Sequence, residues 1–416
     1  MKMKIAIIGS GISGLTCAYH LSKKNEVHIF EQGDYIGGHT CTVNVETQSG
    51  KYNIDTGFIV FNDWTYPEFI KLMNEIGVPS QETAMSFSVK SDISGLEYNG
   101  TSINSLFAQR LNFLRPSFHL MIKDILRFNK ESLSLLSSDE EAHLSLGEYL
   151  EKHHYSRHFI DNYIVPMGGA IWSSSAEQMQ SFPAQFFVQF FKNHGMLSVD
   201  NRPVWRVIKN GSSSYIKPLI KNFENNIRLN SPVLSVKRNQ DSVKIISKRD
   251  GVSLEEEFDQ VIFASHSDQT IKMLTDASAL EKEIFDGFQY QPNSVVLHTD
   301  ESLLPKKKLA WAAWNYFIPK LKTQHVAVTY NMNILQGLKS PETFCVSLNL
   351  DDQIDQKKIL RKFTYDHPVY SLKTIRSQAN WNKISGNNRT HFCGAYWGFG
   401  FHEDGVKSAL KVITHF

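Results

Sequence analysis

The sequence predicts an α/β fold built on a parallel sheet, and three observations near the N-terminus predict it. First, the apolar run Ile5 to Ile8 has the composition of a buried strand. Second, a Gly-x-Gly-x-x-Gly turn follows directly and leads into a run compatible with a helix; its glycines are Gly9, Gly11 and Gly14. Third, another apolar strand, Val27 to Phe30, ends in the acid Glu31. These features in this order indicate a Rossmann-type dinucleotide-binding unit.

Each part of this unit has an expected role. Gly9 permits the tight turn, Gly11 lets a pyrophosphate approach the helix N-terminus, and Gly14 lets the helix pack on the strand. Glu31 can accept hydrogen bonds from ribose hydroxyls. The predicted cofactor contacts in this unit are Gly9, Gly11, Ile12, Ser13, Gly14, Glu31 and Gln32.

Composition bounds the class of protein. A chain of 416 residues can hold two or three domains. Its formal net charge is only +2, which gives no electrostatic case for nucleic acid as a partner. The 27 phenylalanines indicate either an apolar pocket or a large aromatic core.

The cysteines and the N-terminus bear on the compartment. Cys17, Cys41, Cys345 and Cys393 include no C-x-x-C pair, so we expect neither a disulfide framework nor a metal site. The first strand begins almost at Met1, which leaves no room for a signal peptide, and no stretch approaches the roughly 20 apolar residues of a membrane span. We expect a cytoplasmic protein, with contact to the inner membrane surface as an open alternative.

A second informative stretch follows the acid. Gly37 and Gly38 supply bare backbone for a second approach to a cofactor, which domains that bind only NAD do not need. The strand-like segment Tyr52 to Phe61 then has Asp55-Thr56-Gly57 at its centre, which can equally be an ordinary turn.

At this point the chain resembles a family. Its glycine-rich turn, Glu31 and Gly37-Gly38 are similar to the N-terminal signature of FAD-dependent amine-oxidase-like flavoproteins, such as monoamine oxidases, protoporphyrinogen oxidases and phytoene desaturases. A bacterial branch of predicted NAD/FAD-binding proteins is closer still, through Asp55 to Val60, Met85 to Ser88, Leu106 to Arg110, Pro166 to Trp172 and Phe399 to Gly405. The resemblance covers essentially the whole chain. It implies FAD as the cofactor, in a fold of the amine-oxidase and glutathione-reductase type, and adds Gly37, Gly38, His39, Thr56, Gly57 and Phe58 as contacts.

Two amphipathic stretches leave alternatives open. Ser102 to Leu136 alternates apolar and basic residues, with a helix break at Pro116, and can lie on a membrane or pack on its own domain. Phe182 to Leu197 carries paired phenylalanines that form either the wall of a substrate tunnel or plain core. Lys306 to Lys308 is most simply a solvated surface run.

Strand patterns dominate between Trp205 and Thr275. We predict strands at 233–238, 243–248 and 258–264, which form a small antiparallel meander and a return to the nucleotide-binding sheet. By resemblance, Ala264 lies beside the adenine half of FAD, and Val233 or its neighbour Leu234 contacts the adenine. Further strands at 294–298, 326–330 and 344–348 would complete a substrate domain.

The final block, from Thr390, reads as a strand, a glycine-rich loop and a helix. By resemblance the helix points at the pyrimidine end of the flavin, with Asp404, Gly405 and Val406 placed there. Relatives usually have Gly-Asp or Gly-Glu after the strand, whereas this chain has Gly394-Ala395. Gly394 remains a predicted contact, and Ala395 has a role by position only.

The candidate catalytic residues are His402, Tyr396 and His39. His402 is the predicted titrating group near the flavin, and Tyr396 is one of four aromatic residues that either face the flavin or pack around it; the others are Trp397, Phe399 and Phe401. His39 stands where most relatives have Arg, and it either donates a hydrogen bond and shuttles protons or replaces Arg at a phosphate. Glu403 and Asp404 are expected to complement the helix N-terminus.

These observations predict a discontinuous FAD-binding domain of residues 1–90, 205–275 and 385–416, and a substrate domain of residues 91–204 and 276–384 with a helical subdomain. The expected function is an FAD-dependent oxidoreductase that oxidises or desaturates a hydrophobic substrate by hydride transfer to flavin N5. An unsaturated or modified fatty-acyl chain is the preferred substrate, and O2 or another molecule accepts the electrons. The alternatives are a flavin amine oxidase and a non-redox FAD-dependent isomerase or mutase.

Overall fold

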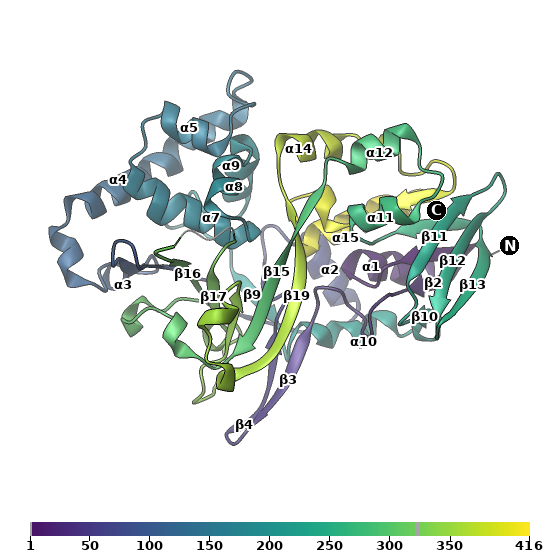
Figure 1. Cartoon of the computed structure of the whole chain (residues 1–416), viewed down its shortest axis with the longest axis horizontal. Coiled ribbons are helices and arrows are strands. Elements are labelled where there is room, and N and C mark those ends of the chain that lie inside the picture. The colour runs from purple at the N-terminus through teal and green to yellow at the C-terminus, as the bar shows by residue number, and fades with distance from the viewer. Residues whose placement is uncertain (1, 322–324) are drawn as a thin grey trace.

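The computed structural model describes residues 2–321 and 325–416. Figure 1 shows a nucleotide-binding region, which carries both chain ends, on the right and a group of helices, α3 to α9, on the left. The long strands β15 (Gln289–His298) and β19 (Ile359–Val369) pass between these two regions.

A five-stranded parallel sheet forms the centre of the nucleotide-binding region, in the order β10-β2-β1-β14-β20. The strands are β10 (Ile227–Arg228), β2 (Glu26–Phe30), β1 (Lys4–Ile8), β14 (Gln260–Phe263) and β20 (Thr390–Phe392). β1 is the central strand, and both of its neighbours run parallel to it. Ile7 lies opposite Ile29 on one side and opposite Ile262 on the other. The predicted α/β class is therefore confirmed.

Helices cover one face of this sheet. α1 (Ile12–Leu21) and α15 (His402–Ile413) pack on each other, and α2 (Pro67–Glu75) and α10 (Ile216–Ile220) join the same apolar core with Ile5, Ile7 and Ile29. Cys17 of α1 lies in this core with its Sγ 3.9 Å from the Sγ of Cys393. All four cysteines are free thiols in buried positions.

A three-stranded meander covers the other face. β11 (Val233–Arg238), β12 (Val243–Arg249) and β13 (Val252–Phe258) form it, and Val236 and Ile245 pack against Ala6 and Phe263, beside α11 (Ser267–Met273) and α12 (Ala279–Phe285). The prediction placed Phe258 at the start of the returning strand, but it ends β13. The sequence did not reveal β13 because five of its seven side chains are exposed and three of the seven are glutamates.

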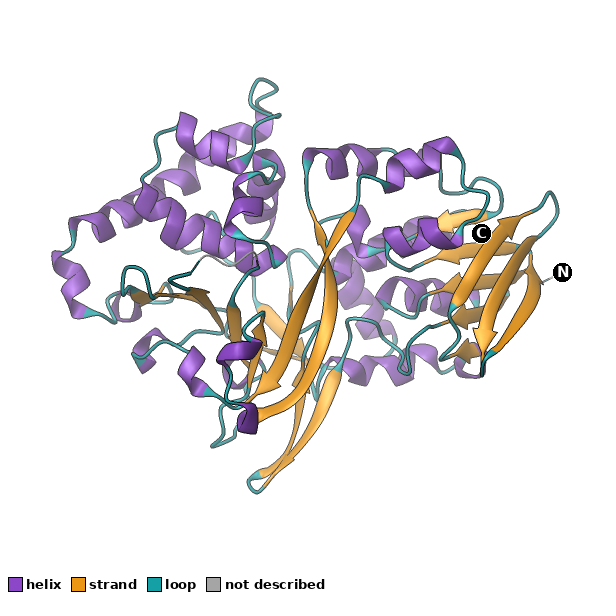
Figure 2. Ribbon diagram, in the orientation of Figure 1, coloured by secondary structure: helices purple, strands orange, loops and turns teal. Residues whose placement is uncertain are grey.

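The second region is built on a seven-stranded sheet in the order β19-β15-β18-β17-β16-β7-β8. Its long strands β15 and β19 are the two that cross at the centre of Figure 2. Predicted strands correspond to β15, β17 (Val328–Asn331) and β18 (Cys345–Leu348). The prediction missed β16 (Trp314–Ile318) and β19, while β7 (Phe87–Ser91) and β8 (Glu97–Asn99) come from an earlier part of the chain. β7 lies across the expected domain boundary at residue 90, and the domain limits themselves stay a prediction.

Helices cover this sheet on the left of Figure 1. They are α3 (Ile103–Leu106), α4 (Pro116–Glu131), α5 (Leu146–Lys152), α6 (Arg157–Phe159), α7 (Val165–Trp172), α8 (Ala176–Gln180) and α9 (Ala184–Asn193). The break at Pro116 is confirmed, since Pro116 occupies the first turn of α4 after a short 3-10 helix, Arg110–Leu114. The paired phenylalanines of α9 are core, because Phe187 and Phe191 are buried and Phe186 and Phe190 lie behind Phe399 and Phe401.

Short elements join the two regions: the hairpin β3 (Thr42–Thr47) and β4 (Gly50–Asp55), the small sheet of β5 (Phe61–Asn62), β6 (Ser80–Glu82) and β9 (Trp205–Ile208), and helices α13 (Met332–Leu335) and α14 (Leu372–Ala379). Asp55 is central to this junction. Its buried carboxylate accepts hydrogen bonds from the Ser212 amide at 2.8 Å and from Gln336 Nε2 at 3.1 Å. No helix among the described residues is both long enough and apolar enough to cross a membrane.

Candidate active site

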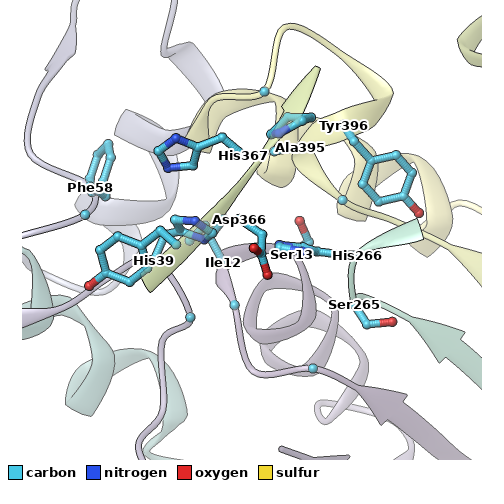
Figure 3. Close-up of a pocket in the computed structure, with 18 of the residues that line it drawn as sticks. Ile12, Ser13, His39, Phe58, Ser265, His266, Asp366, His367, Ala395 and Tyr396 are labelled. Carbon is cyan, nitrogen blue, oxygen red and sulfur yellow. The ribbon is translucent and has the colours of Figure 1, made fainter. Parts of the chain in front are cut away.

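A cavity of about 750 Å³ lies between the glycine-rich turn after β1 and the seven-stranded sheet. One end is lined by the backbone of residues 9–13, and the other by side chains of the second sheet, Val295, Trp314, Tyr330 and Leu348. Figure 3 shows Ile12 and Ser13 below the cavity and His367 and Tyr396 above it. The cavity is thus shared by the two regions of the molecule.

The three glycines of the turn differ in what surrounds them. A Cβ on Gly9, which has φ +105°, would lie 2.9 Å from the carbonyl oxygen of Ala264, and one on Gly14 would lie 2.1 Å from that of Gly9. A Cβ on Gly11 would meet no atom within 4 Å. Gly9 and Gly14 are therefore required by packing, whereas Gly11 keeps open a space at the N-terminus of α1, where amide groups attract an anion.

Glu31 is held in place by backbone donors. Its Oε2 accepts hydrogen bonds from the amide and the hydroxyl of Ser10, at 2.9 and 2.7 Å, and its Oε1 accepts one from the amide of Gly33 at 2.8 Å. The carboxylate lines the cavity together with Gln32. Because each carboxylate oxygen has a further lone pair, Glu31 can still accept hydrogen bonds from a ribose.

The Gly37-Gly38 pair lies against the first turn. Gly37 forms a backbone bridge with Gly11, and a Cβ on Gly38 would lie 3.3 Å from Gly11 Cα. Both residues have positive φ angles, 131° and 59°. Side chains here would push the two segments apart, so the pair allows this segment to pack closely on the first turn. The predicted approach of the pair to a cofactor stays a prediction.

Three histidines from separate segments meet beside this turn. The ring of His39 lies 6.0 Å from that of His266 and 5.6 Å from that of His367, and 5.0 Å from the phenol ring of Tyr365. Its Nε2 makes no hydrogen bond within the described residues. Burial lowers the pKa of all three imidazoles, that of His39 well below its usual value and that of His367 to about 4, so they are neutral at pH 7.

The segment Thr56 to Phe58 is fixed beside His39. The amide of Phe58 donates to the carbonyl oxygen of His39 at 2.8 Å, and a Cβ on Gly57 would lie 2.1 Å from that same oxygen. The hydroxyl of Thr56 is 3.1 Å from that of Tyr365. All three residues line the cavity.

His402 begins α15 and also lines the cavity. Its Nε2 lies 3.0 Å from the hydroxyl of Thr40 and 3.3 Å from that of Tyr215. Burial lowers the pKa of His402 to about 3, so the ring is neutral rather than a group that titrates near pH 7.

The loop before α15 brings Gly394, Ala395 and Tyr396 to the cavity. A Cβ on Gly394 would lie 2.3 Å from the ring of Tyr396, so the glycine makes room for that ring. Burial raises the pKa of the Tyr396 phenol, and its hydroxyl has no hydrogen-bond partner among the described residues. Phe399 and Phe401 also line the cavity, whereas Trp397 packs against Phe285 and Phe288.

Four predicted contacts lie outside the cavity lining: Gly14, Asp404, Gly405 and Val406. Asp404 accepts a hydrogen bond from the amide of Phe401 at 3.0 Å and so caps its own helix. Gly405 allows α15 to approach α1, because a Cβ there would lie 2.8 Å from Ile12 Cγ2, and Val406 is buried in the core. Glu403 instead caps α2, since its carboxylate accepts from the amides of Glu68 and Phe69.

The remaining predicted contacts do line the cavity, and so do residues that the sequence did not indicate. Ala264 and Val233 line it, and Leu234 does not; their contact with the adenine stays a prediction. The overlooked residues include six at or just after the end of β19: Thr364, Tyr365, Asp366, His367, Pro368 and Tyr370. The described part of the chain has no cluster of His, Cys, Asp and Glu that could hold a metal ion.

The residues present fit FAD. Gly11 leaves an open cradle at a helix N-terminus for a pyrophosphate, Glu31 faces the position of a ribose, and the cavity continues far enough for a second half of a dinucleotide. The orphaned Nε2 of His39 supplies a further polar atom toward such a group.

Comparisons with known proteins agree with this geometry. Residues 12–331 match the family model described as flavin containing amine oxidoreductase. A fatty acid isomerase from P. acnes that produces CLA superposes with a TM-score of 0.70 at 15% identity, covering 100% of this chain and 98% of that one. A triple mutant of putrescine oxidase gives 0.72 at 15% identity, covering 100% and 99%. Cyclohexylamine oxidase from Brevibacterium oxydans gives 0.66 at 12% identity, covering 100% and 98%.

At these identities the structural neighbours show the fold alone, and a search of curated protein sequences found no match. The fold and the cavity define an FAD-dependent oxidoreductase. Because the family model covers most of its length, the chain belongs to the flavin-containing amine oxidoreductases.

Proposed function

We propose that this enzyme oxidises or desaturates a hydrophobic substrate, preferably an unsaturated or modified fatty-acyl chain, and that O2 or another acceptor reoxidises the flavin. The observation that carries the proposal is the continuity of the cavity. It extends from the cofactor cradle at Gly11 to a wall of Val295, Trp314, Tyr330 and Leu348, which can bury an apolar chain.

FAD, when bound, supplies the acceptor for a hydride from a substrate carbon. The chain's own residues bind and orient the substrate and the cofactor, and they exclude water. The apolar wall removes water from the acyl chain, and Gly11, Glu31 and Gly38 hold the dinucleotide at the turn.

The catalytic candidates differ in whether their polar atoms already have hydrogen-bond partners, and we assign their roles on that basis. The Tyr396 hydroxyl and His39 Nε2 have no partner within the described residues, so each can bind a cofactor or substrate atom. The Nε2 of His402 is already engaged by Thr40 and Tyr215, which supports a positioning role for that ring.

Amine oxidation is the second candidate, and Asp366 is the observation that favours it. Its carboxylate lines the cavity beside the histidines and can pair with a substrate ammonium group. The fatty acid isomerase among the structural neighbours keeps non-redox isomerisation as a further alternative.

An anaerobic experiment separates these reactions. The purified protein is mixed with a panel of fatty acids, phospholipids and amines, and the flavin absorbance is followed together with product mass. Bleaching by acyl lipids and not by amines supports the proposal, and bleaching by amines alone contradicts it. An isomerase is identified by two results together: the substrate does not bleach the oxidised flavin, and a product with the mass of the substrate forms once the flavin has been reduced beforehand.

An acyl substrate is carried by membranes, so the proposal includes a cytoplasmic location with peripheral contact at the inner membrane surface. Fractionation of cells that produce the protein tests it: recovery in a salt-extractable membrane fraction is expected, and recovery outside the cytoplasm would contradict it.

A further inference from the structure

One end of the molecule exposes apolar and basic side chains without acidic ones. It consists of residues 101–123, which include α3, the 3-10 helix Arg110–Leu114 and the start of α4, together with residues 306–311, which contact α3; we call it the basic tip. In Figure 1 α3 and α4 lie at the far left, at the opposite end of the molecule from both termini.

Large apolar side chains of the basic tip are exposed. Leu111 is 69% exposed, Leu114 is 80% exposed and Ile103 is 76% exposed, and Phe113 and Leu309 are exposed beside them. Single exposed apolar residues are common on soluble proteins, but the basic tip exposes six, these five and Leu120, which form a patch of the kind found at interfaces. Phe113 is held rigidly, because its ring stacks on Phe107 with centroids 3.7 Å apart.

The charges of the basic tip have one sign. Residues 101–123 contain Arg110, Arg115 and Lys123 and no Asp or Glu, and residues 306–311 add Lys306 to Lys308. These six positive charges exceed the net charge of the whole chain, +2, so the rest of the chain has a net charge of −4, which is 2 minus 6. The basic tip is therefore a local positive patch on a molecule that is otherwise negative.

These cations are available to a partner. The guanidinium of Arg110 donates only to Asn104 and Phe107 oxygens, and within the described residues none of the six cations forms an ion pair. Glu97 is buried, and its carboxylate accepts hydrogen bonds from the amides of Lys306 and Lys307. These two bonds fix the lysine run against the sheet. All three lysines are exposed, and the ammonium of Lys308 lies 5.0 Å from the centroid of the Trp311 ring.

We infer that the basic tip docks on an anionic phospholipid bilayer, with Leu111, Leu114 and Ile103 entering the headgroup region and the six cations facing lipid phosphates. Apolar side chains surrounded by cations match an anionic membrane surface in both polarity and charge. A second copy of this chain would instead bring two positive patches together, which opposes self-association.

Docking there would place the substrate side of the cavity close to the lipid. Leu309 of the basic tip precedes Trp314 of the cavity wall by five residues, and the backbone between them is pinned by Asn99, whose side chain donates to the carbonyl of Trp311 at 2.7 Å. The inference rests on the proposed function only for this delivery of substrate, since exposure and charge alone carry the docking itself.

The test is sedimentation of the FAD-loaded full chain with vesicles. Binding is expected to equimolar phosphatidylglycerol and phosphatidylcholine, to weaken as salt rises and to be nearly absent with phosphatidylcholine alone. The double variant Leu111→Ser, Leu114→Ser is expected to bind about tenfold more weakly or worse. Replacing Lys306, Lys307 and Lys308 by Ala is expected to weaken vesicle binding about fivefold for each lysine.

Matched controls keep the test decisive. Val252→Ser with Leu254→Ser changes two exposed apolar residues of β13 at the other end of the molecule and should bind like wild type. Ile103→Ser with Leu309→Ser gives an independent second pair at the basic tip, and FAD content reports whether each variant is folded. Vesicle binding needs no turnover, so a protein without activity on acyl lipids still tests the surface.

Three results would overturn the inference. They are equal binding of wild type and all three tip variants, equal binding to charged and uncharged vesicles, and a dimer in analytical ultracentrifugation that the tip variants dissociate.

Discussion

The ring of His402 stacks face to face on the ring of Phe58, with centroids 3.6 Å apart and an interplanar angle of 12°. The two residues are 344 positions apart in the chain, yet this contact joins the N-terminus of α15 to the segment that follows β4. Thr40 and Tyr215 engage the same imidazole through its Nε2. His402 therefore connects α15 to three other segments around the cavity, those of Thr40, Phe58 and Tyr215.

Replacing His402 separates its two contributions. His402→Phe keeps a flat ring for the stack on Phe58 but loses the bond to Thr40, and His402→Ala loses both. We expect urea unfolding to show a loss of about 1 kcal/mol for the first variant and about 3 kcal/mol for the second. Equal losses in the two variants would mean that the stack contributes nothing.

Gly11→Val tests the cofactor cradle. Because a Cβ at Gly11 meets no protein atom, the variant is expected to fold normally but to lose FAD, since the side chain fills the pyrophosphate position. The flavin absorbance of the purified protein measures this.

Gly100→Val is the matched control, because a Cβ there also meets open space, but Gly100 lies in the turn after β8, outside the cavity lining. A yellow Gly11→Val protein with wild-type FAD content would disprove the cradle.

The hydrogen-bonded pair of Asp55 and Gln336 can be tested by exchanging the acid and the amide. Gln336 Nε2 donates to Asp55 Oδ2 at 3.1 Å, while Gln336 Oε1 accepts from the Asp55 amide at 2.9 Å. Asp55→Asn places two amide donors together, and Gln336→Glu places two carboxylates together. We expect each single variant to lose about 2 kcal/mol of unfolding free energy.

The double variant restores a donor opposite an acceptor, so we expect it to regain at least half of that loss, measured as the coupling energy of a double-mutant cycle in urea. Additive losses would show that the pair is not coupled across the junction of the two regions.

The buried histidines make stability depend on pH. Burial lowers the pKa of His194, His298, His367 and His391 to about 4 in the folded protein, below the unfolded value of about 6.5. The unfolded chain therefore binds more protons between these values. The stability that the neutral rings contribute is fully present above pH 6.5 and is lost as the pH falls toward 4, at about 1.4 kcal/mol per pH unit for each histidine.

Asp55 acts in the opposite direction. Burial raises the pKa of its carboxyl to about 6, so this one group favours the folded state as the pH falls through 6 toward 4. Burial also raises the pKa of the Asp404 carboxyl to about 6, so it acts in the same direction as Asp55. Urea midpoints at pH 7, 6 and 5 should still fall, because four histidines outweigh these two carboxyls. The urea midpoint of His367→Asn should fall less steeply with decreasing pH than that of wild type. An identical slope would show that His367 is not a neutral, buried imidazole in the folded protein.

Much of the fold could be predicted from local patterns. The strand, turn and helix of residues 5–21 and the final strand-loop-helix from Thr390 are each encoded in contiguous residues, where apolar runs and glycines determine the backbone. β13 and β19 escaped prediction because each buries only one side chain, Phe258 and Tyr365, so pairing with a neighbouring strand, rather than burial, keeps them extended.

The sequence by itself determined the cofactor end of the site, since Gly9, Gly11, Glu31 and Gly37-Gly38 act through backbone geometry that a short segment specifies. Only the tertiary structure brought His39, His266 and His367 together and added the end of β19 to the cavity. In the tertiary structure Asp404 caps its own helix and Gly405 lets α15 pack on α1, and both residues lie outside the cavity lining. The physical reason is that such contacts depend on how distant strands and helices pack, and no spacing along the chain carries that information.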